Sequence, residues 1–222
     1  MREDIRGLAF DLDGTFYPNY RFYVRLIPFV LKEWRYLLAF SKARTNLRKT
    51  FRDGNFYDLQ ALLMGEILKR DGALVKGRTE QLIYRGWEPL FKKVKPYPHV
   101  RETLSAFKSS GLSLGLLSDF PAEQKLKYLG LDGYWDTVIC SEHTNRLKPD
   151  PAPFRELARC MALPPEQILY VGNSVSYDII GAKQQGMKAA LVVGPLGRRR
   201  RNTGNADFVF SDYRQLRAFV LN

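Results

Sequence analysis

From residue 96 onward, short apolar runs alternate with segments whose apolar residues recur at helical spacing. The runs expected as strands cover 112–117, 135–140, 167–171, 188–193 and 207–210, and a further strand is expected at 5–10, near the start of the chain. The expected helices cover 100–109, 122–129, 153–161 and 177–185, and a further helix is expected at the end of the chain. Glycines 111, 130 and 186 stand where three of these helices should stop. This alternation predicts an α/β fold in which helices cover both faces of a parallel sheet.

Residues 16–94 follow a different, purely helical pattern. Residues 17–40 form the most apolar stretch outside the strands, but Arg25, Lys32 and Arg35 interrupt it before the roughly 20 apolar residues of a membrane span accumulate. Pro28 suits either the first turn of a helix or a kink. Helical spacing also marks 56–68 and 82–91. We therefore expect a small helical domain here, with an interfacial amphipathic helix as the alternative for 17–40.

Two carboxylates follow the first strand. Asp11 and Asp13 are two residues apart, so an extended chain points them the same way, and Gly14 then lets the chain turn. A cation or a shared proton relieves such crowding, and Mg²⁺ prefers oxygen ligands of this kind. One carboxylate can then act as a nucleophile while its neighbour moves a proton. The ordinary alternative is a strand followed by an Asp-Gly turn.

Three later segments carry further polar side chains. Ser118 and Asp119 follow the second strand, and Lys148 lies in a proline-containing loop just before Pro149. Asn173 precedes Asp178 after a later strand. Taken singly, each has an ordinary reading: a helix N-cap, a solvated lysine or a surface charge. Most of them come just past a strand, where parallel sheets bind ligands. Their joint occurrence therefore favours one shared site.

With these four segments in this order, the chain resembles the haloacid dehalogenase-like (HAD) hydrolase superfamily along its whole length. The long insert between the first two segments is similar to the helical cap of the phosphoglycolate phosphatase-like subgroup. The resemblance implies a Rossmann-like core, residues 1–15 and 95–222, and a helical cap domain, residues 16–94. Only 29 residues separate Ser118 from Lys148, which leaves too little chain for a second large lid.

The resemblance also implies roles for the two leading carboxylates. Asp11 would attack phosphorus and form an aspartyl-phosphate. Asp13 would protonate the leaving alcohol and then deprotonate the water that hydrolyses the intermediate. Relatives that are dehalogenases or phosphonate hydrolases lack an aspartate at the position of Asp13, so its presence favours phosphate monoesters.

The remaining motif residues would bind phosphate and metal. The resemblance implies that Ser118, the backbone N–H of Asp119 and Lys148 hold the phosphoryl group. It also implies that Asp11, Asp13, Asn173 and Asp178 hold Mg²⁺. Asn173 stands where relatives usually have an aspartate, and a neutral amide contributes less charge than a carboxylate. We therefore expect weaker magnesium affinity, with Asp178 carrying more of the load.

These observations lead to a magnesium-dependent phosphatase acting on a small phosphorylated metabolite. A phosphomutase of the same superfamily is the first alternative. A non-catalytic protein that binds a polyanion or a membrane through a basic cap is the second, although nucleic acid is not expected as a partner. Tyr17, Arg21 and Arg25 are candidates for touching the substrate because they closely follow Asp13.

The composition of the chain is ordinary, but its positive charge is concentrated in two segments. The 222 residues are 45% apolar and 26% charged, which is ordinary for a globular protein. The net charge is +12, and within residues 16–94 the 16 Lys and Arg against 7 Asp and Glu give +9. Arg198 to Arg201 form a second basic run. A positive lid would concentrate anionic substrates, although it would also suit a polyanion or an acidic membrane, and a basic solvated surface is the ordinary alternative.

Cys140 and Cys160 are too few for a disulfide framework. Their apolar surroundings predict two reduced, buried side chains in a cytoplasmic protein, and no leading signal segment is expected.

Overall fold

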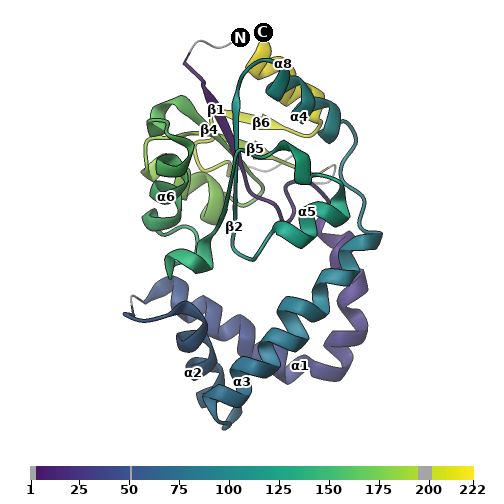
Figure 1. Ribbon diagram of the computed structural model, residues 1–222, viewed down its shortest axis with the longest axis vertical. Helices are drawn as coiled ribbons and strands as arrows, with labels where there is room; N and C mark the ends of the chain where they lie inside the picture. Colours follow the sequence, from purple (N-terminus) through teal and green to yellow (C-terminus); the bar gives the residue numbers. More distant parts are fainter. Residues whose placement is uncertain (1–3, 51, 195–201) are drawn as a thin grey trace.

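A parallel sheet forms the upper half of the molecule in Figure 1. The computed structural model describes residues 4–50, 52–194 and 202–222. In these residues the sheet has six strands, in the order β3-β2-β1-β4-β5-β6, and every neighbouring pair is parallel. The strands are β1 (Gly7–Phe10), β2 (Ser113–Ser118), β3 (Thr137–Cys140), β4 (Ile168–Gly172), β5 (Lys188–Val192) and β6 (Phe208–Phe210). The predicted parallel α/β class is confirmed.

Helices cover both faces of this sheet because successive strand residues point to opposite sides. Leu8 and Phe10 belong to one buried cluster, which includes residues of α4 (Val100–Ser109), α5 (Glu123–Leu129) and α8 (Tyr213–Leu221). Ala9 belongs to the other, with α6 (Pro151–Met161) and α7 (Ile180–Gln184). Single-turn helices η3 (Asp132–Tyr134), η4 (Ser141–Thr144) and η5 (Pro165–Gln167) lie in the connections, and the π-helix η6 (Val175–Ile179) leads into α7.

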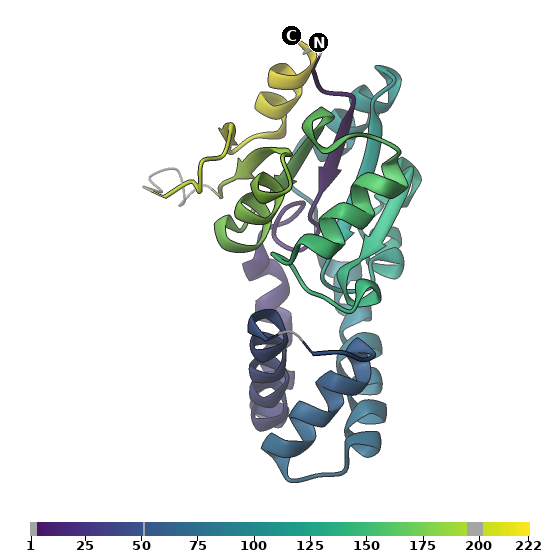
Figure 2. The same cartoon turned by 90° about the vertical axis from the view of Figure 1, so that its left-hand side faces the viewer.

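Residues 16–94, for which we use the name cap, lie below the sheet in Figure 1 and extend the molecule in the turned view of Figure 2. The remaining residues are called the core. The helices of the cap are α1 (Asn19–Lys49), α2 (Phe56–Leu68), α3 (Gly72–Thr79), η1 (Glu80–Arg85) and η2 (Glu88–Lys93). The side chains of Asn55 and Asp71 cap the first turns of α2 and α3. Where the chain enters and leaves the cap, the Tyr97 N–H donates to the Phe16 carbonyl at 2.7 Å.

Helix α1 runs further than the expected 17–40 and ends at Lys49. Pro28 lies in its interior rather than in its first turn, and helical geometry is interrupted at Glu33 (φ −123°, ψ 24°). Within the described residues, no helix combines the length and apolar character needed to cross a membrane.

The two cysteines differ in burial. Cys140 is buried, but Cys160 is exposed, so the prediction that both are buried is wrong for Cys160. The inward face of α6 is made by Phe154, Leu157, Ala158 and Met161, and Cys160 falls outside their helical spacing. The Arg198–Arg201 run lies outside the described residues.

Candidate active site

The predicted site residues gather at the carboxyl end of the sheet. Strand β1 has β2 on one side and β4 on the other, so the strand order reverses around it, and a crevice for ligands forms at such a point. Phe10 lies in register with Leu116 and Val171, so the residues that follow these three positions meet at one edge. Asp11, Ser118 and Asn173 all belong to those segments.

Asp11 is buried and held from two sides. One carboxylate oxygen accepts from Lys148 Nζ at 2.7 Å and the other from Thr15 Oγ1 at 2.7 Å. Burial raises the pKa of Asp11 to about 7, although the nearby Lys148 ammonium lowers it. The side chain is therefore fixed in orientation, and further positive charge would favour its ionised form.

Lys148 is the central cation of the site and is only 3% exposed. Its Nζ donates to Asp11 Oδ1 and Asp178 Oδ1, both at 2.7 Å, and lies 3.1 Å from the Tyr170 hydroxyl. Burial alone would lower the pKa of Lys148, but Asp11 and Asp178 raise it well above its usual value. Lys148 therefore stays protonated between two carboxylates.

Asp13 has separate partners, although it is only two residues from Asp11. Its Oδ1 accepts a short hydrogen bond from the Tyr17 hydroxyl, and its Oδ2 accepts from Lys125 Nζ at 2.8 Å. Burial and then the Asp13 charge raise the pKa of Tyr17 well above its usual value, so Tyr17 remains a donor. Gly14, at φ +91°, makes the turn that follows both carboxylates.

Ser118 ends β2 and is fully buried, and its Oγ accepts from the Phe120 N–H at 3.2 Å. The next helix, α5, begins at Glu123 with Ala122 at its N-cap, so Ser118 and Asp119 do not cap it. Asp119 accepts from the Lys148 backbone N–H and from Arg48 Nη2. Burial would raise the pKa of Asp119, but Lys148 and Arg48 hold it below its usual value.

Asp178 is buried rather than a surface charge. Its Oδ2 accepts the backbone N–H groups of Asn173 at 3.1 Å and Ser174 at 2.9 Å, which fixes the turn after β4. Gly172 leaves room for the Asp178 side chain, because a Cβ at residue 172 would lie 2.3 Å from the Cβ of Asp178. Glycine is therefore required by the packing of the carboxylate against the strand end.

The metal ligands expected from the sequence line one cavity of about 790 Å³, together with Lys148 and Asp119. The four expected ligands of the metal are Asp11, Asp13, Asn173 and Asp178. All four offer side-chain oxygen atoms, which suit a hard cation. Within the described ranges, no three acidic, histidine or cysteine side chains converge to form a ready metal cluster. Mg²⁺ usually takes only one or two carboxylates and keeps several waters, so this donor set fits it.

The sequence did not identify several residues that complete the site. Lys125 reaches Asp13 from α5, and Thr15 reaches Asp11 from the turn after β1. Of the candidate substrate contacts, Tyr17 borders the site. Arg21 and Arg25 instead donate to the carbonyls of Lys95 and Lys93, so the expectation that they touch the substrate is not supported by their placement.

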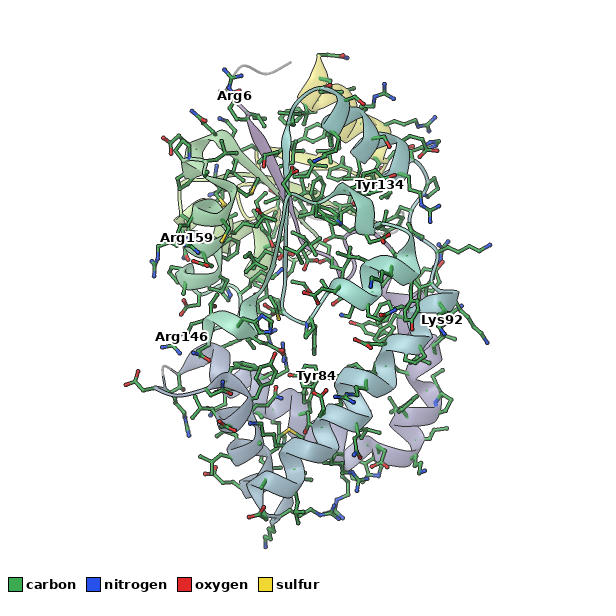
Figure 3. All side chains as sticks on the ribbon, in the orientation of Figure 1. Arg6, Tyr84, Lys92, Tyr134, Arg146 and Arg159 are labelled. Carbon is green, nitrogen blue, oxygen red and sulfur yellow. The ribbon has the colours of Figure 1, made fainter. Side chains whose placement is uncertain are left out.

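Two arginines of α1 join the cap to the core. Arg44 is buried and pairs with the Glu142 carboxylate of η4, and Arg48 pairs with Asp119 at 2.6 Å. Tyr84, labelled in Figure 3, lies where the cap meets the core, and its hydroxyl donates to Glu142 at 2.9 Å. Apart from the helical spacing of Arg44 and Arg48 on α1, the sequence carries no signal that could have found these partners.

Comparison with known proteins finds similar sequences along the chain. A family model described as haloacid dehalogenase-like hydrolase matches residues 5–186. The glyceraldehyde 3-phosphate phosphatase of Methanocaldococcus jannaschii is 28% identical over 98% of both chains. The phosphoglycolate phosphatase of Salmonella typhi is 31% identical, over 83% of this chain and 79% of that protein.

Solved structures share the fold. A HAD phosphatase from Thermococcus onnurineus superposes with a TM-score of 0.72 at 24% identity, covering 97% of this chain and 98% of that one. The L-2-haloacid dehalogenase of Xanthobacter autotrophicus gives a TM-score of 0.66 at 18% identity, covering 98% of this chain and 99% of that one. At these identities the likeness concerns the fold alone.

Proposed function

The chain belongs to the haloacid dehalogenase-like hydrolase family, and we propose that it is a magnesium-dependent phosphatase of small phosphate monoesters. The observation that carries this proposal is the separation of two carboxylates into two environments. Asp11 is buried between Lys148 and Thr15, whereas Asp13 faces Tyr17 and Lys125. Paired carboxylates with different surroundings are suited to different roles in one reaction.

The proposed reaction has two displacements. In the first, an Asp11 oxygen forms a bond to phosphorus, the bond from phosphorus to the ester oxygen breaks, and Asp13 gives its proton to the departing alcohol. In the second, water attacks phosphorus, Asp13 takes a proton from that water, and the bond to Asp11 breaks to release inorganic phosphate. Ser118, the Asp119 N–H and Lys148 hold the phosphoryl oxygens in both steps.

Asp11, Asn173 and Asp178 would hold the magnesium ion, with Asp13 contributing at the same edge of the cavity. When bound, the ion would neutralise charge on the phosphoryl group and favour the ionised form of Asp11. Because Asn173 contributes no charge, we expect Asn173→Asp to lower the magnesium concentration needed for half-maximal activity. A magnesium titration of both proteins measures this difference.

We further propose that the core, residues 1–15 and 95–222, and the cap, residues 16–94, are separate domains. The bond between Phe16 and Tyr97 supports this division, because it brings together the two points where the chain crosses between them. The positive charge of the cap would draw phosphorylated anions toward the site.

The test is phosphate release from p-nitrophenyl phosphate with and without Mg²⁺, for the wild type, Asp11→Asn and Asp13→Asn. Turnover should require the metal and fall at least about a hundredfold in both variants. Asp132→Asn is the matched control, because Asp132 is exposed on η3 and should retain full activity. Retained turnover in Asp11→Asn would contradict the proposal.

Mass spectrometry of acid-quenched protein then tests the intermediate. Asp13→Asn should accumulate a phosphorylated Asp11, because the water that attacks it lacks its base. Asp11→Asn should carry no phosphoryl group. A phosphomutase would instead depend on a bisphosphate activator.

A further inference from the structure

A second cavity lies beside the catalytic one, between α1, η1, η2 and the segment after β2. Its volume is about 430 Å³, within the range of about 300–1,000 Å³ typical of small-molecule sites. Asp13, Arg48 and Phe120 line both cavities, so the two are continuous at the proposed acid. This position suits the part of a substrate that departs when the phosphate ester breaks.

Aromatic side chains make up a large share of the lining of this second cavity. Nine of its twenty lining residues are Phe, Tyr or Trp, from both the cap and the core. Phe22 and Phe91 stack with their centroids 4.6 Å apart, and Phe40 stacks on Phe120 at 6.2 Å. Such a wall gains most by removing apolar or aromatic surface from water.

The charged side chains of the lining are largely committed within the protein. Arg44 pairs with Glu142, Arg48 with Asp119 at 2.6 Å, and Lys125 with Asp13 at 2.8 Å. Glu88 also lines the cavity, and burial raises the pKa of its carboxyl group. These pairs leave the charged groups of the lining with little capacity to bind a polyhydroxylated or carboxylated alcohol.

Trp87 adds apolar surface to this lining. Among the described residues, Trp87 Nε1 is buried and has no hydrogen-bond partner. Because Nε1 is buried, the part of the indole that borders the cavity is apolar.

The size of the cavity also disfavours a very small alcohol. Its volume of about 430 Å³ has room for many water molecules. A two- or three-carbon alcohol would leave much of this space as water against aromatic rings.

We propose that this aromatic cavity is the subsite for the substrate's alcohol part, and that it selects phosphate monoesters of bulky aromatic or similarly apolar alcohols. The inference rests on the proposed phosphatase function and specifies its substrate class.

The first test compares two alkyl esters, 2-phenylethyl phosphate and glycerol 3-phosphate, by release of inorganic phosphate in the presence of Mg²⁺. Both release an alkyl alcohol, so the acidity of the leaving group does not favour either. We expect kcat/KM to be at least about tenfold higher for the phenylethyl ester. An equal or higher value for glycerol 3-phosphate would overturn the substrate class and leave the phosphatase function standing. No hydrolysis of these esters or of p-nitrophenyl phosphate would overturn both.

The second test fills the cavity from its edge. Ser41 is exposed on α1 and lines the cavity, so Ser41→Trp should place a large ring there without disturbing the buried core. Leu38→Trp is the matched control, because Leu38 is 46% exposed on the same helix and does not line the cavity.

Ser41→Trp should raise KM for 2-phenylethyl phosphate about tenfold and change KM for glycerol 3-phosphate less than about twofold. Leu38→Trp should change neither. Circular dichroism melting curves will show that both variants are folded. Equal effects of Ser41→Trp on the two esters, or the same effect from Leu38→Trp, would show that the cavity is not the subsite.

Discussion

Lys125 controls the surroundings of Asp13, although it comes from a helix more than 100 positions away in the chain. Its side chain is 8% exposed, and its Nζ lies about 5 Å from the ring centroids of Phe91 and Phe120. With the aromatic rings on two sides, the ammonium is directed to Asp13 Oδ2 at 2.8 Å. Lys125 is therefore a positioning residue for the proposed acid.

Replacing Lys125 should slow the turnover of esters with poor leaving groups most. We expect Lys125→Met to lower kcat about tenfold for 2-phenylethyl phosphate, because its alkoxide needs a proton from a correctly placed Asp13. With p-nitrophenyl phosphate the loss should be smaller, because nitrophenolate departs without protonation and Asp13 is then needed only to deprotonate the water. Steady-state kinetics on both esters measures the difference.

Lys125→Arg serves as the conservative control and should recover part of the loss, because it keeps a cation near Asp13. An equal loss on both esters in Lys125→Met would point to a general structural defect instead.

Gly172 shows how one missing side chain permits a site. We expect Gly172→Ala to destabilise the protein by about 1–3 kcal/mol, because its Cβ would lie 2.3 Å from Asp178 Cβ. Displacing Asp178 should also reduce turnover, since Lys148 loses a partner. Thermal denaturation and phosphatase assays measure the two effects.

Gly133→Ala is the matched control, because a Cβ at Gly133 meets nothing within 4 Å. Its stability should be unchanged or raised by up to about 1 kcal/mol. Similar losses in both variants would refute the close-packing explanation.

At the scale of elements, the contact between α1 and η4 fixes the cap against the core. Arg44 and Glu142 are both nearly fully buried, and Arg44 also donates to the Asp119 carbonyl at 2.8 Å. The Arg44 guanidinium lies 4.1 Å from the ring centroid of Phe120. This contact therefore links the cap helix to the segment that carries Ser118.

Removing one member of the buried pair should cost more than removing both. Glu142→Leu should lower the free energy of unfolding by about 3 kcal/mol, because it leaves Arg44 charged and unpaired. The double variant Arg44→Met with Glu142→Leu should regain more than half of that loss. Urea denaturation of the single and double variants measures the coupling, and simple additivity of the two losses would contradict it.

At the scale of the whole molecule, charge is distributed unevenly, with +9 of the net +12 within residues 16–94. A dianionic substrate should be attracted over about 10 Å at 0.1 M salt, and over less at higher salt.

We therefore expect kcat/KM for a phosphate monoester to fall several-fold between about 0.05 and 0.5 M NaCl, with little change in kcat. Steady-state kinetics across this series checks the expectation. Urea denaturation at both salt concentrations is the control for unfolding. A salt-independent kcat/KM would show that the basic cap does not draw the substrate in.

The sequence determined those features that local pattern controls. Helix α4 was predicted at 100–109 and spans Val100–Ser109, because its apolar spacing and Gly111 are both local signals. The strand ends placed Asp11, Ser118 and Asn173 at one edge, since parallel strands bring their carboxyl ends together. The error at Cys160 arose because an apolar neighbourhood in sequence does not establish which face of a helix points inward.

Only the tertiary structure decided which distant side chains meet. The bonds from Lys125 to Asp13 and from Arg44 to Glu142 span 112 and 98 positions, and they depend on how the cap and the helices lie against the sheet. The same packing turned Arg21 and Arg25 toward backbone carbonyls and enclosed the aromatic cavity. Periodicity specifies the buried face of an element, whereas the partner across that face is specified by three-dimensional packing.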